Sequence, residues 1–221
     1  EKLLAHGASV YLTSDLEPLP LYIASQAGHA DIVEMLLVKG ANVNQHATDI
    51  GMTALYIASQ QGHAKVVEKL LAHGAHVNID TFEHGRTPLF AASMEGYVDV
   101  VGMLIGKGAD GNLSSTKTGS SPLHVASHGG HSKVVEKLLA HGVDVNRLSR
   151  IGQSPLYVAS KAGHADVVGL LIGKGANVNQ SAADGTTPLA EASTTTAINS
   201  PLYVASERGH LDVVEKLLAH G

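Results

Sequence analysis

Residues 119–146 read GSSPLHVASHGGHSKVVEKLLAHGVDVN, and this stretch decides the fold. Ser121 before Pro122 is typical of a helix start, because the hydroxyl caps free backbone amides and proline fits the first helical position. Gly130 can end that helix in the left-handed conformation. The apolar pairs of VVEKLL lie on one face of a second helix, which ends at Gly142. The stretch therefore predicts two short helices joined by a glycine turn.

The same pattern recurs along the chain. Its opening position falls at residues 20, 54, 88, 122 and 155, so the spacings are 34, 34, 34 and 33. Helices of about 8 to 11 residues are marginal alone, since isolated helices shorter than roughly 12–15 residues rarely hold in water. Each helix pair must bury its apolar stripe against its neighbours. The sequence therefore predicts an all-α solenoid of stacked helix-turn-helix units joined by turn loops.

The composition favours a soluble protein whose hydrophobic core is built as thin layers. The chain of 221 residues is 44% hydrophobic but has only two Phe, six Tyr and no Trp, so Leu, Val, Ile and Ala must fill the interior. A formal charge of −5 without a run of Lys or Arg argues against nucleic-acid binding. No apolar stretch approaches the roughly 20 residues that cross a bilayer, and the absence of cysteine fits a reducing compartment. We expect an intracellular, cytoplasmic protein that does not insert into membranes.

The repeat resembles the ankyrin repeat. The resemblance depends on the period, the Thr-Pro-Leu-His-x-Ala-type opening and the Gly-His, Val-Val, Leu-Leu and Gly-Ala-x-Val-Asn segments that follow; residues 121–126 are the nearest match to the opening. It covers essentially the whole chain and implies an ankyrin-repeat solenoid with hairpin loops. In most units an aromatic residue replaces the usual His of the opening, which gains aromatic packing there: Tyr22, Tyr56, Phe90, Tyr157 and Tyr203.

The period divides a single domain, residues 1–221, into successive units. We expect a partial repeat (second helix and loop only), five full repeats, a truncated remnant and a final repeat, at residues 1–16; 17–50, 51–84, 85–118, 119–151 and 152–184; 185–197; and 198–221. The chain starts and stops within a second helix, which indicates a part of a longer array; the alternative is that these ends contact another chain. We expect a monomer or a part of a longer array.

The register breaks once, before the final repeat. Pro188 and Pro201 are only 13 residues apart, which indicates either a 13-residue insertion or the loss of about 20 residues from one repeat. The repeat-like opening at 185–193 favours the loss. We expect a short helix or extended loop at 186–193, and we expect the last helix pair to dock on the repeat that ends near Asn179.

The fourteen histidines are better explained by the repeat than by chemistry. Most follow the inter-helix Gly or precede the terminal Gly, as suits a turn and a helix C-terminus. The spacing of His124, His128 and His131 could present ligands to zinc, yet only His128 departs from the repeat. Serines such as Ser25 and Ser160 share one helical slot, and no nucleophile elbow or phosphate-binding glycine loop occurs. We expect no catalytic site, no metal site and no cofactor.

The residues that recur in every repeat form the core of the stack. Specificity for a partner must therefore come from the positions at which the repeats differ. In the family that the chain resembles, partners bind the concave face, which comprises the exposed part of the first helices and the turn tips. Carried over position by position, the resemblance implies partner-binding residues before each Gly-His pair and at the turn tips: Gln26, Gln60, Gln61, Met94, Glu95, His128, Lys161, Glu207 and Arg208; Asp49, Ile50, Met52, Glu83, His84, Arg86, Lys117, Thr118, Arg150, Ile151 and Gln153.

These residues mix both charges with apolar groups, as a protein-binding surface does. Arg86, Lys117 and Arg150 lie in neighbouring turns and could favour an acidic segment of a partner; the alternative is solvated surface charge. The sequence therefore predicts an interaction scaffold for a protein or extended peptide of unknown identity, without nucleic acid as a partner. Two alternatives are a regulatory or targeting segment of a larger enzyme or channel and a purely structural spacer.

Overall fold

The computed structural model describes residues 19–47, 49–180 and 200–220. Within these ranges the regular structure is helical, apart from one isolated bridge between His46 and Thr53. The chain divides into two compact units, of which the first comprises residues 1–110 and the second residues 111–221.

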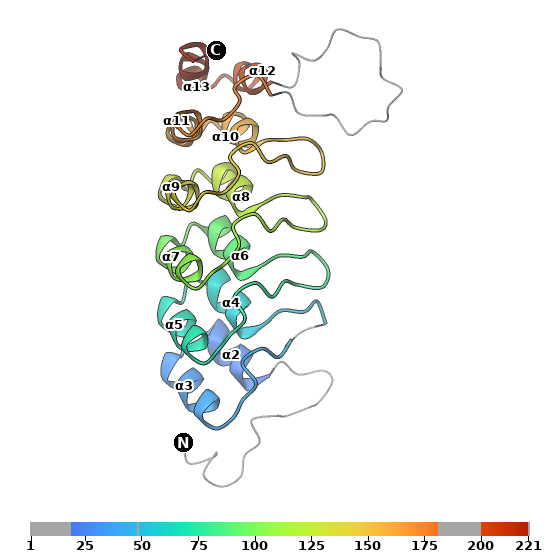
Figure 1. Cartoon of the computed structure of the whole chain (residues 1–221), viewed down its shortest axis with the longest axis vertical. Coiled ribbons are helices and arrows are strands. Elements are labelled where there is room, and N and C mark those ends of the chain that lie inside the picture. Colours follow the sequence, from blue (N-terminus) through green and yellow to red (C-terminus); the bar gives the residue numbers. More distant parts are fainter. Residues whose placement is uncertain (1–18, 48, 181–199, 221) are drawn as a thin grey trace. The chain divides into compact units, whose positions relative to one another are not determined.

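The first unit contains three helix pairs in its described residues. Their first helices are α2 (Pro20–Gln26), α4 (Ala54–Gln60) and α6 (Pro88–Glu95), and their second helices are α3 (Ala30–Val38), α5 (Ala64–Ala72) and α7 (Val98–Gly106). Each first helix packs on the first helix of the next pair, and the second helices pack in the same way. The helices therefore form two rows, and the loops between pairs project on the side of the first helices (Figure 1).

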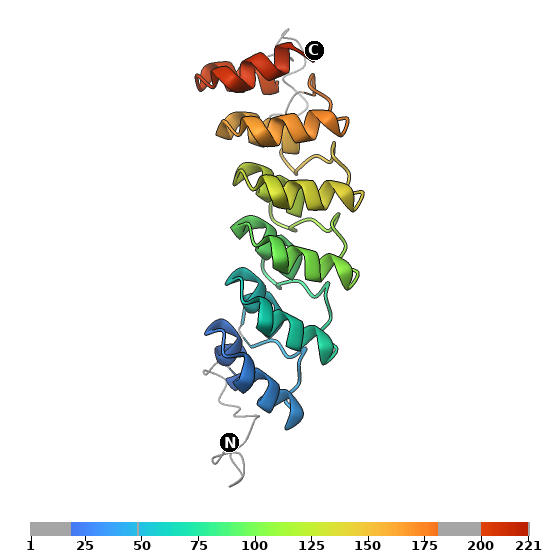
Figure 2. The ribbon, with the colours of Figure 1, turned by 90° about the vertical axis from the view of Figure 1, so that its left-hand side faces the viewer.

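The second unit has the same plan. Its first helices are α8 (Pro122–His128), α10 (Pro155–Ala162) and α12 (Pro201–Glu207), and its second helices are α9 (Ser132–Ala140), α11 (Ala165–Gly173) and α13 (Leu211–Leu218). The second helices lie side by side as successive rungs (Figure 2). Both units thus have the predicted all-α arrangement of stacked helix pairs.

The helix boundaries are those that the capping pattern predicts. The hydroxyl of Thr87 accepts a hydrogen bond from the Phe90 amide at 3.2 Å, and Ser154 caps α10 in the same manner. Thr53 caps α4 even though alanine replaces proline there. After the first helices, Gly62 and Gly163 have φ of 73° and 80°, a conformation that glycine adopts without a Cβ penalty.

The core is a layer of leucines, one from each helix of a pair. Leu55 and Leu70 are fully buried in the first unit, as are Leu123 and Leu138 in the second. Each such side chain stabilises the fold by about 1.5–3 kcal/mol relative to an exposed one. The serines that share one slot of the first helices are fully buried: Ser25, Ser59, Ser127 and Ser160.

The final helix pair docks as predicted. Helix α12 packs on α10, α13 packs on α11, and the His210 Nε2 lies 3.2 Å from the Lys161 carbonyl oxygen. The pair therefore continues the stack of the repeat that ends near Asn179. The predictions for 1–16, 185–197 and 186–193 fall outside the described residues.

Candidate functional site

The loop between successive helix pairs folds back as a hairpin. Backbone amides of its first arm donate to carbonyl oxygens of its second arm at 2.8–3.0 Å: Ala47 to Met52, Thr81 to Arg86, Ser115 to Ser120 and Ser149 to Gln153. A glycine with positive φ, such as Gly51 or Gly119, allows the chain to reverse. The predicted hairpin loops are therefore present in both units.

Neighbouring hairpins are joined through the backbone. The Phe82 amide donates to the Ile50 carbonyl at 2.9 Å in the first unit, and the Arg150 amide donates to the Thr118 carbonyl at 2.9 Å in the second. A Cβ on Gly119 would lie 2.5 Å from the Arg150 amide nitrogen. The missing side chain thus lets the next hairpin approach closely, and the tips of adjacent hairpins are held in a fixed register.

None of the predicted partner-binding residues is buried. Those at the ends of the first helices are exposed except Gln60 and Met94, which are half-buried. At the hairpins, the exposed residues are Asp49, Glu83, Lys117, Thr118, Arg150 and Ile151. The half-buried ones are Ile50, Met52, His84, Arg86 and Gln153.

Arg86 differs from the other predicted cations because it packs inside the first unit. Its guanidinium carbon lies 5.4 Å from the centroid of the Phe90 ring. Burial raises the pKa of Tyr56, and a hydrogen bond from Arg86 together with its positive charge partly opposes that rise. Arg86 therefore links two successive repeats, and the exposed positive charge of the hairpin tips is that of Lys117 and Arg150.

In both units, the residue two positions after the repeat opening contacts the second hairpin arm of the next repeat. The Tyr22 hydroxyl lies 3.5 Å from the Met52 sulfur in the first unit. In the second unit the His124 Nε2 donates to the Gln153 carbonyl at 2.9 Å, while its Nδ1 accepts from the Ser121 amide at 3.2 Å. Burial, the largest effect, lowers the pKa of His124 below its ordinary value of 6.5. This histidine is therefore neutral at pH 7, and both ring nitrogens serve the fold.

The histidines after the inter-helix glycines also join repeats. The Nε2 atoms of His63 and His164 lie 3.0 Å and 2.9 Å from the carbonyl oxygens of Gln26 and His128, at the ends of the preceding first helices. Because a carbonyl only accepts, each Nε2 carries the hydrogen. The backbone of these predicted partner-binding residues is thus fixed by the following repeat.

The second set of histidines lies at helix C-termini, as predicted. The His73 Nδ1 bonds to the Lys69 carbonyl at 3.0 Å, and His220 bonds to Lys216 at 2.9 Å. Within residues 19–47, 49–180 and 200–220, no cluster of three or more His, Asp or Glu residues is arranged to hold a metal ion.

The asparagines of the Val-Asn pairs bond to the backbone of the next repeat. The Asn146 Nδ2 donates to the Gly175 carbonyl at 3.1 Å, and its Oδ1 accepts from the Asn177 amide at 2.8 Å. Asn78 bonds to the equivalent backbone groups of the next repeat in the first unit. These side chains are therefore links between successive repeats.

Phe82 is an exposed tip residue that the sequence analysis missed. Its side chain is 66% exposed, and its ring centroid lies 4.4 Å from that of His46, at 45°. A Cβ on Gly51 would lie 2.5 Å from this ring, so the glycine makes room for it. The sequence signal that could have found it is that one of the two phenylalanines in the chain lies in a polar turn.

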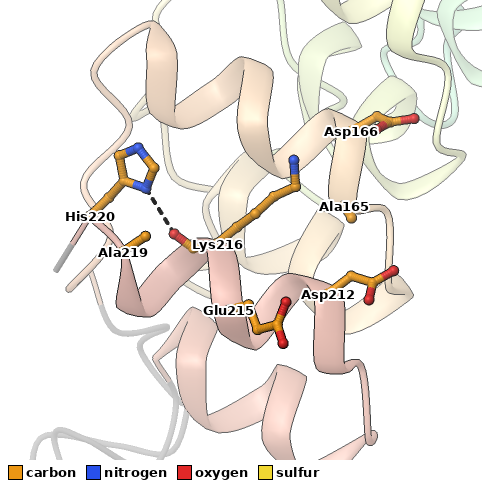
Figure 3. Close-up of a pocket in the computed structure, with 7 residues that line it drawn as sticks. All are labelled: Ala165, Asp166, Asp212, Glu215, Lys216, Ala219 and His220. Atoms are coloured by element: carbon orange, nitrogen blue, oxygen red, sulfur yellow. Dashed lines mark hydrogen bonds between the residues drawn. The ribbon is translucent and has the colours of Figure 1, made fainter.

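A groove of about 460 Å³ lies on the second helices α11 and α13 (Figure 3). Its polar lining residues are Asp166, Asp212, Glu215, Lys216 and His220. In the equivalent groove between α3 and α5, Lys69 pairs with Glu34 at 3.1 Å. Both grooves are open and ionic, and exposed ion pairs of this kind contribute only about 0–1 kcal/mol.

Comparison with known proteins agrees with this architecture. A family model for ankyrin repeats in three copies matches residues 1–81, 21–115, 79–149 and 123–221, which together cover the whole chain. A search of curated proteins finds no match. Among the residues that the structure describes, every helix is too short or too polar to span a bilayer.

Proposed function

Because the chain belongs to the ankyrin repeat family, whose repeats are generally protein-interaction modules and typically non-catalytic, we propose that it is an interaction scaffold. Its binding surface comprises the hairpin tips and the adjoining ends of the first helices, and its partner is a protein or an extended peptide. The proposal rests above all on the backbone bonds that join Phe82 to Ile50 and Arg150 to Thr118.

These bonds favour binding because they order the tips before a partner arrives. Association costs free energy when loops or side chains must be immobilised, and a preorganised surface lowers that cost. The carbonyl bonds of His63 and His164 fix the neighbouring ends of the first helices in the same way. The surface is thus rigid in its backbone, although it consists largely of loops.

The side chains on these tips suit a protein partner. Phe82 is 66% exposed and Ile151 is 53% exposed, so each offers apolar surface that a partner can cover. Charged residues such as Glu83 and Arg150 lie beside them. An apolar anchor with a polar surround is the usual composition of an energetically important contact.

The proposal is tested by affinity capture from cell extract. We expect Phe82→Ala with Ile151→Ala to reduce the captured partner about tenfold or more, because loss of an anchor residue commonly costs above 1 kcal/mol. The thermal unfolding midpoint should not change, since both side chains are mostly exposed. The matched control is Lys65→Ala with Glu68→Ala, two exposed residues of the second helix α5. Equal capture by the hairpin variant and the wild type would contradict the proposal.

A further inference from the structure

The two hairpins that the structure describes in the second unit contain cations but no carboxylate. Residues 112–121 contain Lys117, and residues 146–154 contain Arg147 and Arg150; neither segment has an Asp or a Glu. The chain as a whole has a formal charge of −5. The positive charge of this surface is therefore a local feature against an acidic background.

The hairpins of the first unit have the opposite character. Their exposed charged residues are Asp49, Asp80 and Glu83, and the one arginine, Arg86, packs on Phe90. The two units therefore present different chemistry at equivalent positions, and among the described hairpins those with exposed Lys or Arg side chains at their tips belong to the second unit.

Two bonds hold the second unit's hairpins side by side along their length. The Arg147 Nε donates to the Ser114 hydroxyl at 2.9 Å near the base, and the Arg150 amide donates to the Thr118 carbonyl at 2.9 Å near the tip. Arg147 is thus engaged within the fold. The side chains of Lys117 and Arg150 are exposed, and neither forms an ion pair with a residue that the structure describes.

The same two hairpins expose three aliphatic side chains. Leu113 is 37% exposed, Leu148 is 41% exposed and Ile151 is 53% exposed. Single exposed apolar residues are ordinary on protein surfaces, but several on neighbouring loops indicate an interaction site. Here they lie on the hairpins that also supply the unpaired cations.

We infer that the second unit's hairpins recognise an acidic and apolar segment of the partner protein. Carboxylates of that segment pair with Lys117 and Arg150, and its apolar side chains cover Leu148 and Ile151. An arginine guanidinium can hold a carboxylate through two parallel hydrogen bonds, which adds specificity to the charge attraction. The inference rests on the proposed function and specifies the chemistry of its partner.

A nucleic acid fits this surface less well. Its affinity depends on many cations that neutralise successive phosphates, whereas these hairpins offer two exposed cations beside aliphatic groups. Carboxylates alternating with apolar side chains match both features of the surface. An oligonucleotide is therefore included in the test as the competing anion.

The test selects dodecapeptides from a random phage-displayed library on the immobilised full chain. We expect the enriched peptides to contain more Asp, Glu, Leu and Ile than the input library. An enriched set without a surplus of acidic residues would overturn the inference while leaving the proposed function intact. Failure to enrich any peptide would count against both.

Two charge-reversal variants identify the surface that the selected peptide uses. Lys117→Glu with Arg150→Glu should raise the Kd of a selected acidic peptide about tenfold or more, measured by fluorescence anisotropy. Lys133→Glu with Lys137→Glu reverses two exposed cations of the second helix α9 and changes the net charge equally; it should change the Kd less than twofold. Equal effects of the two variants, or binding of a dT12 oligonucleotide as tight as that of the peptide, would overturn the inference.

Discussion

Gly111 and Val143 form a size-complementary pair that links two repeats of the second unit. Each repeat ends in a Gly-Ala-x-Val-Asn segment, and we compare the Val of one segment with the Ala of the next. At two junctions these residues are Val77 with Ala109 and Val145 with Ala176. At the junction of Gly111 and Val143, the small residue comes first and the valine second. Both residues are buried, and a Cβ built on Gly111 would overlap the Val143 Cγ1. The glycine therefore makes the space that the valine fills.

The two single substitutions should each destabilise the chain. Val143→Ala removes two buried methyl groups, worth about 0.8 kcal/mol each, and leaves a small cavity, so we expect a loss of about 2 kcal/mol. Gly111→Val forces two branched side chains into one space, for which overpacking costs about 1–3 kcal/mol. The backbone of Gly111 is not left-handed, so a side chain there causes no left-handed strain.

The double variant should recover most of the lost stability. Gly111→Val with Val143→Ala restores the valine–alanine arrangement of the other junctions, so we expect a free energy of unfolding within about 1 kcal/mol of the wild type. The single losses sum to about 3–5 kcal/mol, so the implied coupling energy is about 2 kcal/mol or more, at the upper end for residues in contact. Equilibrium urea unfolding, followed by far-UV circular dichroism, measures all four proteins. If the double variant instead loses the sum of the two single losses in free energy of unfolding, the packing argument is refuted.

Three further predictions concern the links between repeats in the second unit. His124→Tyr should reduce the loss of stability on acidification. Burial lowers the pKa of His124 in the folded state, so below about pH 6.5 the unfolded chain binds more protons and the wild type loses stability. Equal shifts of the urea midpoint between pH 7.5 and 5.5 in both proteins would contradict this. Gly130→Ala should cost about 2 kcal/mol, because φ is 70° and the new Cβ would lie 2.6 Å from the His164 Nδ1; an unchanged thermal midpoint would refute it. Asn146→Ala should cost about 1 kcal/mol and speed amide exchange at Asn177, whose amide loses its acceptor; unaltered exchange there would be inconsistent with the inter-repeat bond.

The sequence predicts the helices well because their signals are local. A capping hydroxyl before Pro88 or Pro155, a left-handed glycine after the first helix and an apolar stripe on the second are all read within one repeat. The burial of Ser25 and the docking of α12 follow from the same period. These features depend on residues that lie close together in the chain.

The hairpin surface was less predictable because its contacts span about one repeat length. Arg86 hydrogen-bonds to Tyr56 of the preceding repeat besides contacting the Phe90 ring of its own repeat, and the turn pattern alone assigned it to the binding surface. The reach of Asn146 to the Gly175 carbonyl is of the same kind. Phe82 was missed because turn residues were chosen by repeat position, whereas its exposure depends on the fit over Gly51.

The central claim, that a partner contacts the joined hairpin tips, is tested most directly by site-specific photocrosslinking. The photoreactive amino acid p-benzoylphenylalanine would replace Ile151 at a hairpin tip in one protein and Glu136, an exposed residue of α9, in another. After irradiation in cell extract, the account predicts a discrete crosslinked partner from position 151 and none from position 136. The same partner crosslinked from position 136 and absent at position 151 would contradict it.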